Sequence, residues 1–502
     1  MSADEAKRVS ADEAKRVSAD EAKRVSADEA KRVSADHVER TIGESQGSER
    51  ESRRLLPENL RRRAGELAND VAERLGDAEA DRQIVDRPGN VEPIFGSSMW
   101  LPGTLSNGLA GTALMYSLLA RSDPRCLQLA HRHLQAALES ATWNSQGGLM
   151  GGPAGILAAA QGASGVGKNY PGLREKLTTR LAATQTEAVR AYAEALKDGV
   201  HWLAYDIMHG VTGVLRVLMD EPSKDARSAV EATNGYLCSH ILKRRESGLP
   251  GWWVPSELEP IAEDRETYPH GDLNLGMAHG VTGVVATLTT LAERASLTPE
   301  MEDALRRAVD WMAMWRQEVD GVPYWPARIP AELNGSPRDA PPQFTRAAWC
   351  YGTPGVALTL MRAGRLLGDP GVVDTAVDAL VGHLQAPEHA WRLDGPTFCH
   401  GYSGALHVLH RAWLIRGDER LRQLALTMAS KLIDDMAEPD APFIFRHWMP
   451  DSPEGWQKAD SYKRVDSVGL LEGASGVAAV LYSLSLDDPS DLPAWDRVFA
   501  LS

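Results

Sequence analysis

Apolar residues recur at helical spacing along most of this 502-residue chain, in two alternating kinds of segment. One kind carries almost no charge, as in residues 281–291. The other kind is interrupted by charged side chains, as in residues 125–140. A helix with one charged face is typical of a protein surface, whereas an uncharged run indicates a buried helix. We therefore predict an all-α fold in which buried and half-exposed helices alternate.

Each uncharged run follows a Gly-x-x-Gly motif, and this motif occurs seven times. The glycine pairs are Gly108/Gly111, Gly152/Gly155, Gly210/Gly213, Gly280/Gly283, Gly352/Gly355, Gly401/Gly404 and Gly473/Gly476. Successive pairs are 44 to 72 residues apart, which leaves room for one more helix in each repeat. Such amphipathic helices are expected near residues 125–140, 173–196, 226–242, 299–315, 372–384 and 419–436, with a further one beginning at Pro57.

Seven helix pairs favour a closed ring, because a single pair cannot bury its own apolar face. The predicted fold class is an α/α toroid (barrel) of seven inner and seven outer helices. The structural alternative is an open superhelix, which needs polar capping repeats at its ends. Residues 470–484 of the seventh copy are as apolar as the other copies, so closure is favoured.

The N-terminal segment has a different organisation. The octamer Ser-Ala-Asp-Glu-Ala-Lys-Arg-Val occurs four times without change between Ser2 and Val33. An eight-residue period drifts around a helix by about 80° per copy, so the valines form no continuous apolar stripe. We expect residues 1–52 to be a disordered or partly helical repeat tail and linker, and residues 53–502 to form the toroid domain.

Composition narrows the functional class only a little. The formal net charge of −15 argues against a nucleic-acid-binding surface and permits a basic partner. Four cysteines are too few for a disulfide scaffold of this size, so a reducing cytoplasm is the expected location. No apolar run is long enough for a membrane span, and the N-terminus lacks the order of a signal peptide.

Three connections are long and rich in proline and aromatic residues. They are residues 244–275, 318–346 and 437–468. Loops of this length are often lids or binding surfaces, and aromatic residues beneath them also form small satellite cores. The sequence favours neither interpretation.

The residue directly before the first glycine of each pair is polar or ionisable in six of the seven copies. The residues at this position are Asn107, Gly151, His209, His279, Tyr351, His400 and Glu472, and Gly151 is the exception. A packing position would hold interchangeable apolar residues instead. We therefore expect the helix starts to surround a polar cavity, into which they direct unpaired N–H groups.

Two cysteines share one position of the repeat in adjacent copies. Cys350 and Cys399 each lie two residues before the first glycine, and His400 follows directly. If the copies are equivalent, the two thiols and the imidazole meet in space. Two sulfurs and one nitrogen are a zinc ligand set with one position left open. The simpler interpretation, small buried cysteines beside a hydrogen-bonded histidine, does not explain why they share this phase.

Acid–base groups lie in the neighbouring copies. Asp206 is four residues before Gly210, and His279 and Arg346 precede the next two helices. Asp206 as a helix cap and Arg346 as the partner of a carboxylate are the structural alternatives. His209 shares the phase of His279, so phase does not decide which histidine is chemical. The residues alone predict a zinc enzyme with nearby acid–base groups and leave the substrate open.

At these positions the sequence resembles the lanthionine synthetase C (LanC) family, the lanthipeptide cyclases. The resemblance spans residues 57–502 and is most specific at Trp349-Cys350-Tyr351-Gly352 and Cys399-His400-Gly401, with further matches at Tyr205-Asp206-Ile207 and Ala278-His279-Gly280. It implies an α/α toroid with Zn²⁺ held by Cys350, Cys399 and His400. It also implies catalytic roles for Asp206 and His279, supported by Arg346 and Tyr351.

The implied reaction is the intramolecular addition of cysteine thiols to dehydroalanine or dehydrobutyrine in a ribosomally made precursor peptide, which forms (methyl)lanthionine thioether rings. Arg346 would stabilise the enolate, His279 would protonate the α-carbon, and Asp206 would orient the thiol or take its proton. The last two roles are interchangeable at this stage. Too few residues precede the toroid for a dehydratase, so a separate dehydratase in a biosynthetic complex is the expected partner.

Three other functions compete with this one. A LanC-like protein that joins glutathione or another small thiol to dehydrated or electrophilic proteins would use the same zinc site. A glycoside hydrolase would use the carboxylates of Asp206 and Glu472 and leaves the cysteines unexplained. A structural-zinc scaffold would need a fourth protein ligand, and none is evident in the phase of Cys350.

Overall fold

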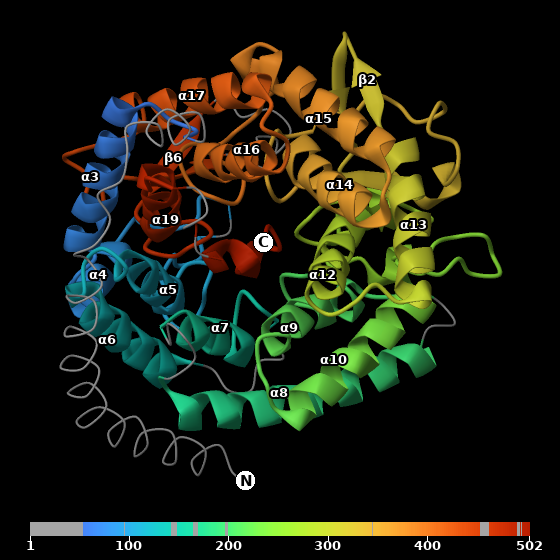
Figure 1. Cartoon of the computed structure of the whole chain (residues 1–502), viewed down its shortest axis with the longest axis horizontal. Coiled ribbons are helices and arrows are strands. Elements are labelled where there is room, and N and C mark those ends of the chain that lie inside the picture. The colour runs from blue at the N-terminus through green and yellow to red at the C-terminus, as the bar shows by residue number, and fades with distance from the viewer. Residues whose placement is uncertain are drawn as a thin grey trace, which may run out of the picture.

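The helices of this protein form a closed ring (Figure 1). The computed structural model describes residues 54–94, 96–141, 148–163, 169–195, 199–343, 345–451, 461–488, 492 and 494–502. The predicted N-terminal tail lies outside these residues, so its conformation stays a prediction.

Seven buried helices make the inner ring, and each begins directly after the first glycine of a pair. They are α5 (Leu109–Leu119), α7 (Pro153–Ala163), α9 (Val211–Leu218), α12 (Val281–Arg294), α14 (Thr353–Leu367), α16 (Tyr402–Arg416) and α19 (Ala474–Ser485). Each inner helix contacts the next one, and α19 contacts α5. The closed α/α toroid predicted from the repeats is therefore confirmed.

The outer ring also has seven members. They are α3 (Glu58–Arg74), α6 (Arg125–Ser140), α8 (Pro171–Ala195), α10 (Lys224–Tyr236), α13 (Pro299–Met314), α15 (Pro370–Gln385) and α17 (Glu419–Asp434). The first of them, α3, packs against α19, the last inner helix. Figure 1 shows α3 and α19 side by side where the two ends of the helical array meet.

The second glycine of each pair allows neighbouring backbones to come close. A Cβ atom on Gly404 would lie 1.9 Å from the carbonyl oxygen of Phe398, and one on Gly213 would lie 2.1 Å from that of Ile207. No side chain fits at such distances, so each inner helix folds tightly back over the turn before it. This geometry explains the repetition of the motif.

Backbone hydrogen bonds join the turns before successive inner helices. Cys350 N–H donates to the carbonyl oxygen of Cys399 at 3.3 Å, and Cys399 N–H donates to that of Leu471 at 3.0 Å. Leu471 N–H in turn donates to Ser106 at 2.9 Å. Positions of equal repeat phase are thereby held side by side at one end of the toroid.

The three long connections contain short strands that pair antiparallel, and the first pair joins two different connections. β1 (Asp272–Asn274) pairs with β4 (Arg328–Pro330), β2 (Gln317–Val319) with β3 (Val322–Tyr324), and β5 (His447–Pro450) with β6 (Tyr462–Val465). Trp252, Trp325 and Phe443 are buried beneath these segments, as expected for satellite cores, whereas Trp253 stays partly exposed. The satellite-core interpretation therefore applies to the buried residues, and the binding-surface interpretation stays a prediction.

Shorter helices complete the described fold. They are α4 (Ala78–Val85), α11 (Asp264–Thr267), a π-helical turn that extends α10 (η3, Leu237–Ile241), and the single turns η2 (Trp202–Ala204), η4 (Ser256–Leu258), η5 (Ala331–Leu333) and η6 (Glu388–Ala390). Within the described part of the chain, no helix combines the length and the apolar character needed to cross a bilayer.

The C-terminal segment η8 (Ala494–Phe499) lies at the centre of the ring in Figure 1. The Phe499 ring stacks on Phe398 with centroids 4.0 Å apart. Its carbonyl oxygen accepts a hydrogen bond from Trp349 Nε1 at 3.0 Å. The inner face of the toroid is therefore filled by the protein's own C-terminal residues, which the repeat pattern does not reveal.

Candidate active site

Two thiols and one imidazole meet where α14 and α16 begin. The ligand atoms of Cys350, Cys399 and His400 all lie within 4.8 Å of one another. Both cysteines are buried and free, and the His400 side chain is 13 % exposed. Among the described residues this is the only such group of three histidine, cysteine or acidic side chains.

This donor set fits a zinc ion. Zinc binds thiolate sulfur at about 2.3 Å and histidine nitrogen at about 2.0 Å, so small side-chain shifts bring all three groups into range. No fourth His, Cys, Asp or Glu ligand joins the group in the described part of the chain. One tetrahedral position is therefore left for an exogenous ligand, as in catalytic zinc sites.

The three groups shift one another's protonation. Hydrogen bonds from Cys399 and His400 hold the pKa of the Cys350 thiol well below its usual range, against the effect of burial. The neighbouring Cys350 sulfur and burial raise the pKa of the Cys399 thiol. Burial disfavours a charged His400, but its hydrogen bond with Cys350 and the negative charges of Cys350 and Asp394 together outweigh burial and raise the His400 pKa. The lowered pKa favours the thiolate at Cys350, which is the form that binds metal.

A buried carboxylate, Asp394, lies beside this set and was missed from the sequence. It pairs with Arg346 Nη1 and accepts a hydrogen bond from the Tyr462 hydroxyl at 2.8 Å. One Asp394 oxygen is 4.0 Å from His400 Nε2. The carboxylate partner considered for Arg346 therefore exists, and it holds the guanidinium close to the metal-ligand histidine.

A second group lies at the start of α9 and α12. His279 Nδ1 is 2.6 Å from Asp206 Oδ2. The other Asp206 oxygen accepts the N–H groups of His209 and Gly210, at 2.8 and 2.5 Å. Asp206 is 1 % exposed, whereas the His279 side chain is 22 % exposed. Asp206 therefore holds His279 and also the turn directly before α9, but it is not a side-chain cap of α9, whose N-cap residue is Gly210.

Aromatic rings fix the plane of the His279 imidazole. The Trp202 ring stacks on it with centroids 4.9 Å apart and an interplanar angle of 22°. The His209 ring is also stacked with it, at 5.9 Å and 24°. The His209 ring therefore packs against the His279 ring, and the backbone N–H of His209 donates to Asp206. Of the two histidines in this phase, His279 is the one paired with a carboxylate.

The two groups meet around Tyr351. Its ring centroid is 6.4 Å from that of His279. The Cys350 carbonyl oxygen accepts hydrogen bonds from Met277 N–H and Ala278 N–H, at 2.8 and 3.1 Å, which brings the turn before α12 against the cysteine. Asn274 Nδ2 donates to the Tyr351 hydroxyl oxygen at 3.1 Å. Burial raises the pKa of Tyr351, so its hydroxyl stays protonated.

Two more residues of the polar phase lie on the far side of the metal-ligand set. Asn107 Nδ2 donates to Glu472 Oε2 at 2.9 Å. Burial favours a protonated Glu472, but the nearby His447 and His400 outweigh it and lower the Glu472 pKa. The His447 ring, from β5, is 5.4 Å from that of His400, and burial lowers the His447 pKa to about 4. A neutral histidine that has no repeat phase therefore lies beside the polar residues that precede the inner helices.

Comparison with known proteins gives three findings. Residues 99–500 match the family described as lanthionine synthetase C-like protein. The nisin biosynthesis protein NisC of Lactococcus lactis subsp. lactis is 26 % identical over 315 residues, which are 61 % of this chain and 72 % of that protein. A solved structure of nisin cyclase superimposes with a TM-score of 0.67 at 20 % identity and covers 89 % of this chain and 98 % of its own.

Proposed function

This chain belongs to the lanthionine synthetase C-like family, and from that premise we propose that it is a zinc-dependent lanthipeptide cyclase. Its substrate would be a precursor peptide that a separate dehydratase has already dehydrated. Cysteine thiols of that peptide would add to dehydroalanine or dehydrobutyrine and close thioether rings. The observation that carries the proposal is the convergence of Cys350, Cys399 and His400 within 4.8 Å.

Cys350, Cys399 and His400 would hold a Zn²⁺ ion, which lowers the pKa of a substrate thiol and keeps it nucleophilic at neutral pH. The protein contributes the negative charge of Cys350 and the buried position of both cysteines. Asp394 forms an ion pair with Arg346 and lies 4.0 Å from His400 Nε2. Such supporting contacts commonly determine how well a metal ligand is oriented.

His279 is proposed as the acid–base group. Its Nδ1 is hydrogen-bonded to the Asp206 carboxylate, which leaves Nε2 for the substrate. The substrate sulfur forms a bond to the β-carbon, and the electrons of the carbon–carbon double bond move to an enolate. His279 Nε2–H then gives its proton to the α-carbon, and the imidazole recovers the proton that the thiol released.

Asp206 is proposed to orient His279 rather than to meet the thiol. It is almost wholly buried, and its oxygens are taken by His279 and two backbone N–H groups. These contacts favour one of the two assignments that the sequence left interchangeable. A carboxylate so placed fixes the imidazole tautomer and stabilises the imidazolium form.

Arg346 and Tyr351 are proposed to stabilise the enolate. Arg346 brings a permanent positive charge, held by Asp394 and by the carbonyl oxygen of Arg392 at 3.2 Å. The Tyr351 hydroxyl oxygen already accepts from Asn274, so its O–H is the part that can donate to a developing oxyanion. Donors positioned in advance are an effective way to lower such barriers.

The test combines metal analysis with a cyclisation assay. Cys350→Ala is expected to lose bound zinc and ring formation, whereas Cys126→Ala, a buried cysteine of α6, should keep both. Zinc per chain is measured by mass spectrometry, and ring closure by protection of the peptide cysteine from alkylation. The peptide carries one cysteine and one dehydroalanine, and no other thiol is added.

Two results would contradict the proposal. One is a Cys350→Ala protein that keeps its zinc and cyclises at the parent rate. The other is a parent protein that leaves the peptide linear but joins added glutathione to it, which would favour the small-thiol alternative.

A further inference from the structure

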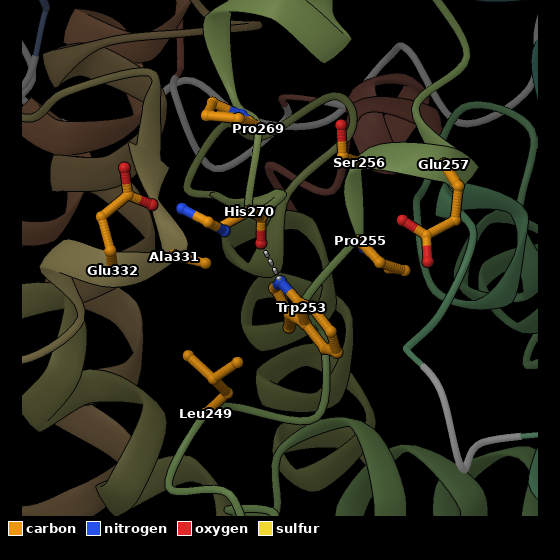
Figure 2. A pocket seen from close by; sticks show the side chains of 9 residues that line it. All are labelled: Leu249, Trp253, Pro255, Ser256, Glu257, Pro269, His270, Ala331 and Glu332. Atoms are coloured by element: carbon orange, nitrogen blue, oxygen red, sulfur yellow. Dashed lines mark hydrogen bonds between the residues drawn. The ribbon is translucent and has the colours of Figure 1, made fainter.

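A pocket of about 480 Å³ lies in the connection between η3 and α12, outside the ring of catalytic candidates (Figure 2). It is lined by Leu249, Trp253, Pro255, Ser256, Glu257, Pro269, His270, Ala331 and Glu332. None of these residues belongs to the repeat phase, and none takes part in the proposed chemistry.

The apolar part of the pocket is built around one indole. Figure 2 shows Trp253 at its centre, with Leu249 below it and Pro255 and Ala331 close by. Trp253 Nε1 donates to the carbonyl oxygen of His270 at 3.1 Å, which fixes the ring in place. A fixed indole beside aliphatic side chains offers a surface for a hydrocarbon stem, and an indole face attracts cations.

Two carboxylates lie on opposite sides of this indole in Figure 2, Glu257 from η4 and Glu332 from η5. Both are exposed, and neither makes an ion pair within the described residues. Arg245 lies 5.9 Å from the Trp253 ring centroid, but it does not line the pocket, and it donates to the carbonyl oxygens of Pro250 and Gly251. The two carboxylates are therefore left to bind a cation from outside.

The pocket and the candidate active site are linked through strand β1, which pairs with β4. Ala331 N–H donates to the carbonyl oxygen of Gly271 at 3.0 Å, directly before β1. At the other end of β1, Asn274 donates to Tyr351. A peptide anchored in this pocket would thus be tethered near the reacting groups, which raises its effective concentration there.

We propose that this pocket binds a lysine or arginine side chain of the precursor peptide, at a position outside the ring being closed. This inference rests on the proposed function. The indole and its aliphatic neighbours pack on the stem of the side chain, and its charged end binds a carboxylate on one side of the indole, Glu257 or Glu332. Leu258 and Ile261, which are 37 % and 51 % exposed on the same connection, extend the contact to apolar neighbours in the peptide. The net charge of −15 favours the approach of a basic peptide.

The first experiment measures binding without chemistry, on the whole protein. The probe is a fluorescein-labelled peptide with lysines next to leucines and without cysteine or dehydro residues, and the readout is fluorescence anisotropy. The double variant Glu257→Gln/Glu332→Gln is expected to weaken binding about tenfold and to reduce its salt dependence. The matched control, Glu263→Gln/Glu266→Gln, removes the same charge from exposed positions outside the pocket. It should weaken binding less than twofold.

The second experiment uses a dehydrated peptide with one cysteine and one lysine. The Glu257→Gln/Glu332→Gln protein should show a raised KM and the parent kcat. When norleucine replaces the lysine of the peptide, the KM of the parent protein should rise by a similar factor. Equal effects of the two double variants, or equal binding of a probe with glutamates in place of the lysines, would overturn the proposal. If the parent cyclises no peptide, the proposed function fails, whereas the anisotropy result still decides the binding site.

Discussion

Among the described residues, two aspartate–histidine pairs are at hydrogen-bond distance, and they differ in what surrounds them. His279 and Asp206 are 2.6 Å apart, and the His279 side chain is 22 % exposed. His407 and Asp496 are 2.7 Å apart, and both side chains are 0 % exposed. The same two groups at the same separation are thus open to a substrate in one place and sealed by the C-terminal segment in the other.

The difference shows that pairing with a carboxylate does not by itself mark a catalytic histidine. Asp496 is also bound by Arg411 through two hydrogen bonds of 2.6 and 2.7 Å, so its charge is balanced inside the core. Asp206 has only neutral backbone donors besides its histidine. The His407–Asp496 pair stabilises the packing of η8, whereas the His279–Asp206 pair leaves one imidazole nitrogen of a partly exposed histidine accessible.

The largest expected effect comes from His279→Ala. We expect cyclisation to slow by about 10³-fold, because a positioned acid–base group commonly contributes 10²–10⁴. Thermal unfolding should change less than in Asp496→Ala below, because Asp206 keeps two backbone N–H donors and the His279 side chain is 22 % exposed. Rapid-quench kinetics measures the cyclisation rate, and calorimetry measures the unfolding temperature. A large loss of stability with an unchanged rate per folded molecule would mean that His279, like His407, has a structural role.

The next effect is the loss of stability on Asp496→Ala. Removing this carboxylate leaves Arg411 and His407 without their buried partner, which commonly costs about 3–5 kcal/mol. Denaturant unfolding gives the free energy. Asp487→Ala serves as the control, because that aspartate pairs with Arg54 and Arg61 while its own side chain is 77 % exposed, and such pairs contribute about 0–1 kcal/mol.

A smaller effect is expected at Trp202, whose ring stacks on His279. Trp202→Ala should reduce kcat about tenfold, because an untethered imidazole spends less time in the reactive orientation. Trp202→Phe keeps a ring and should recover most of the activity. A rate unchanged by the alanine variant would mean that Asp206 alone fixes His279, and the pH profile of kcat reports any change at the imidazole.

The smallest effect is a dependence of stability on pH at the sealed pair. Burial holds the pKa of His407 below its usual range, and burial together with His407 lowers that of His410 much further. The unfolded chain therefore binds protons more readily than the folded one at these histidines. Their contribution to stability is complete above the ordinary histidine pKa and is lost as the pH falls below about 6.5. Unfolding at pH 5.5 should need less denaturant than at pH 7.5, and His410→Leu should reduce this difference by roughly 1 kcal/mol.

The features that the sequence predicts well are those that recur at the same position of each repeat. The seven glycine pairs locate every inner helix start, and the shared position of Cys350 and Cys399 leads to the metal-ligand set. The repeats are equivalent because the sterically required glycines give each of them the same backbone geometry. Phase cannot separate His279 from His209, because that choice depends on where one carboxylate, Asp206, points.

Residues outside the repeats could not be placed in this way. Asp394, Trp202, His447 and Asp496 lie in connections or in η8, and no period relates them to the glycine pairs. Their contacts arise from how long segments fold back over the ring. The helix α4, which is capped by Asp77, was also not foreseen, because it is only eight residues long.

The packing of α3 against α19 gives the ring a seam. Elsewhere consecutive inner helices are joined by the chain itself, but between α19 and α5 only noncovalent contacts hold the circle together. Charged pairs such as Arg61 with Asp487 and Arg63 with Asp434 lie along this seam. Local unfolding should therefore begin there, and amide hydrogen exchange in α3 and α19 should be faster than exchange in α14 and α16, the helices that follow Cys350 and His400.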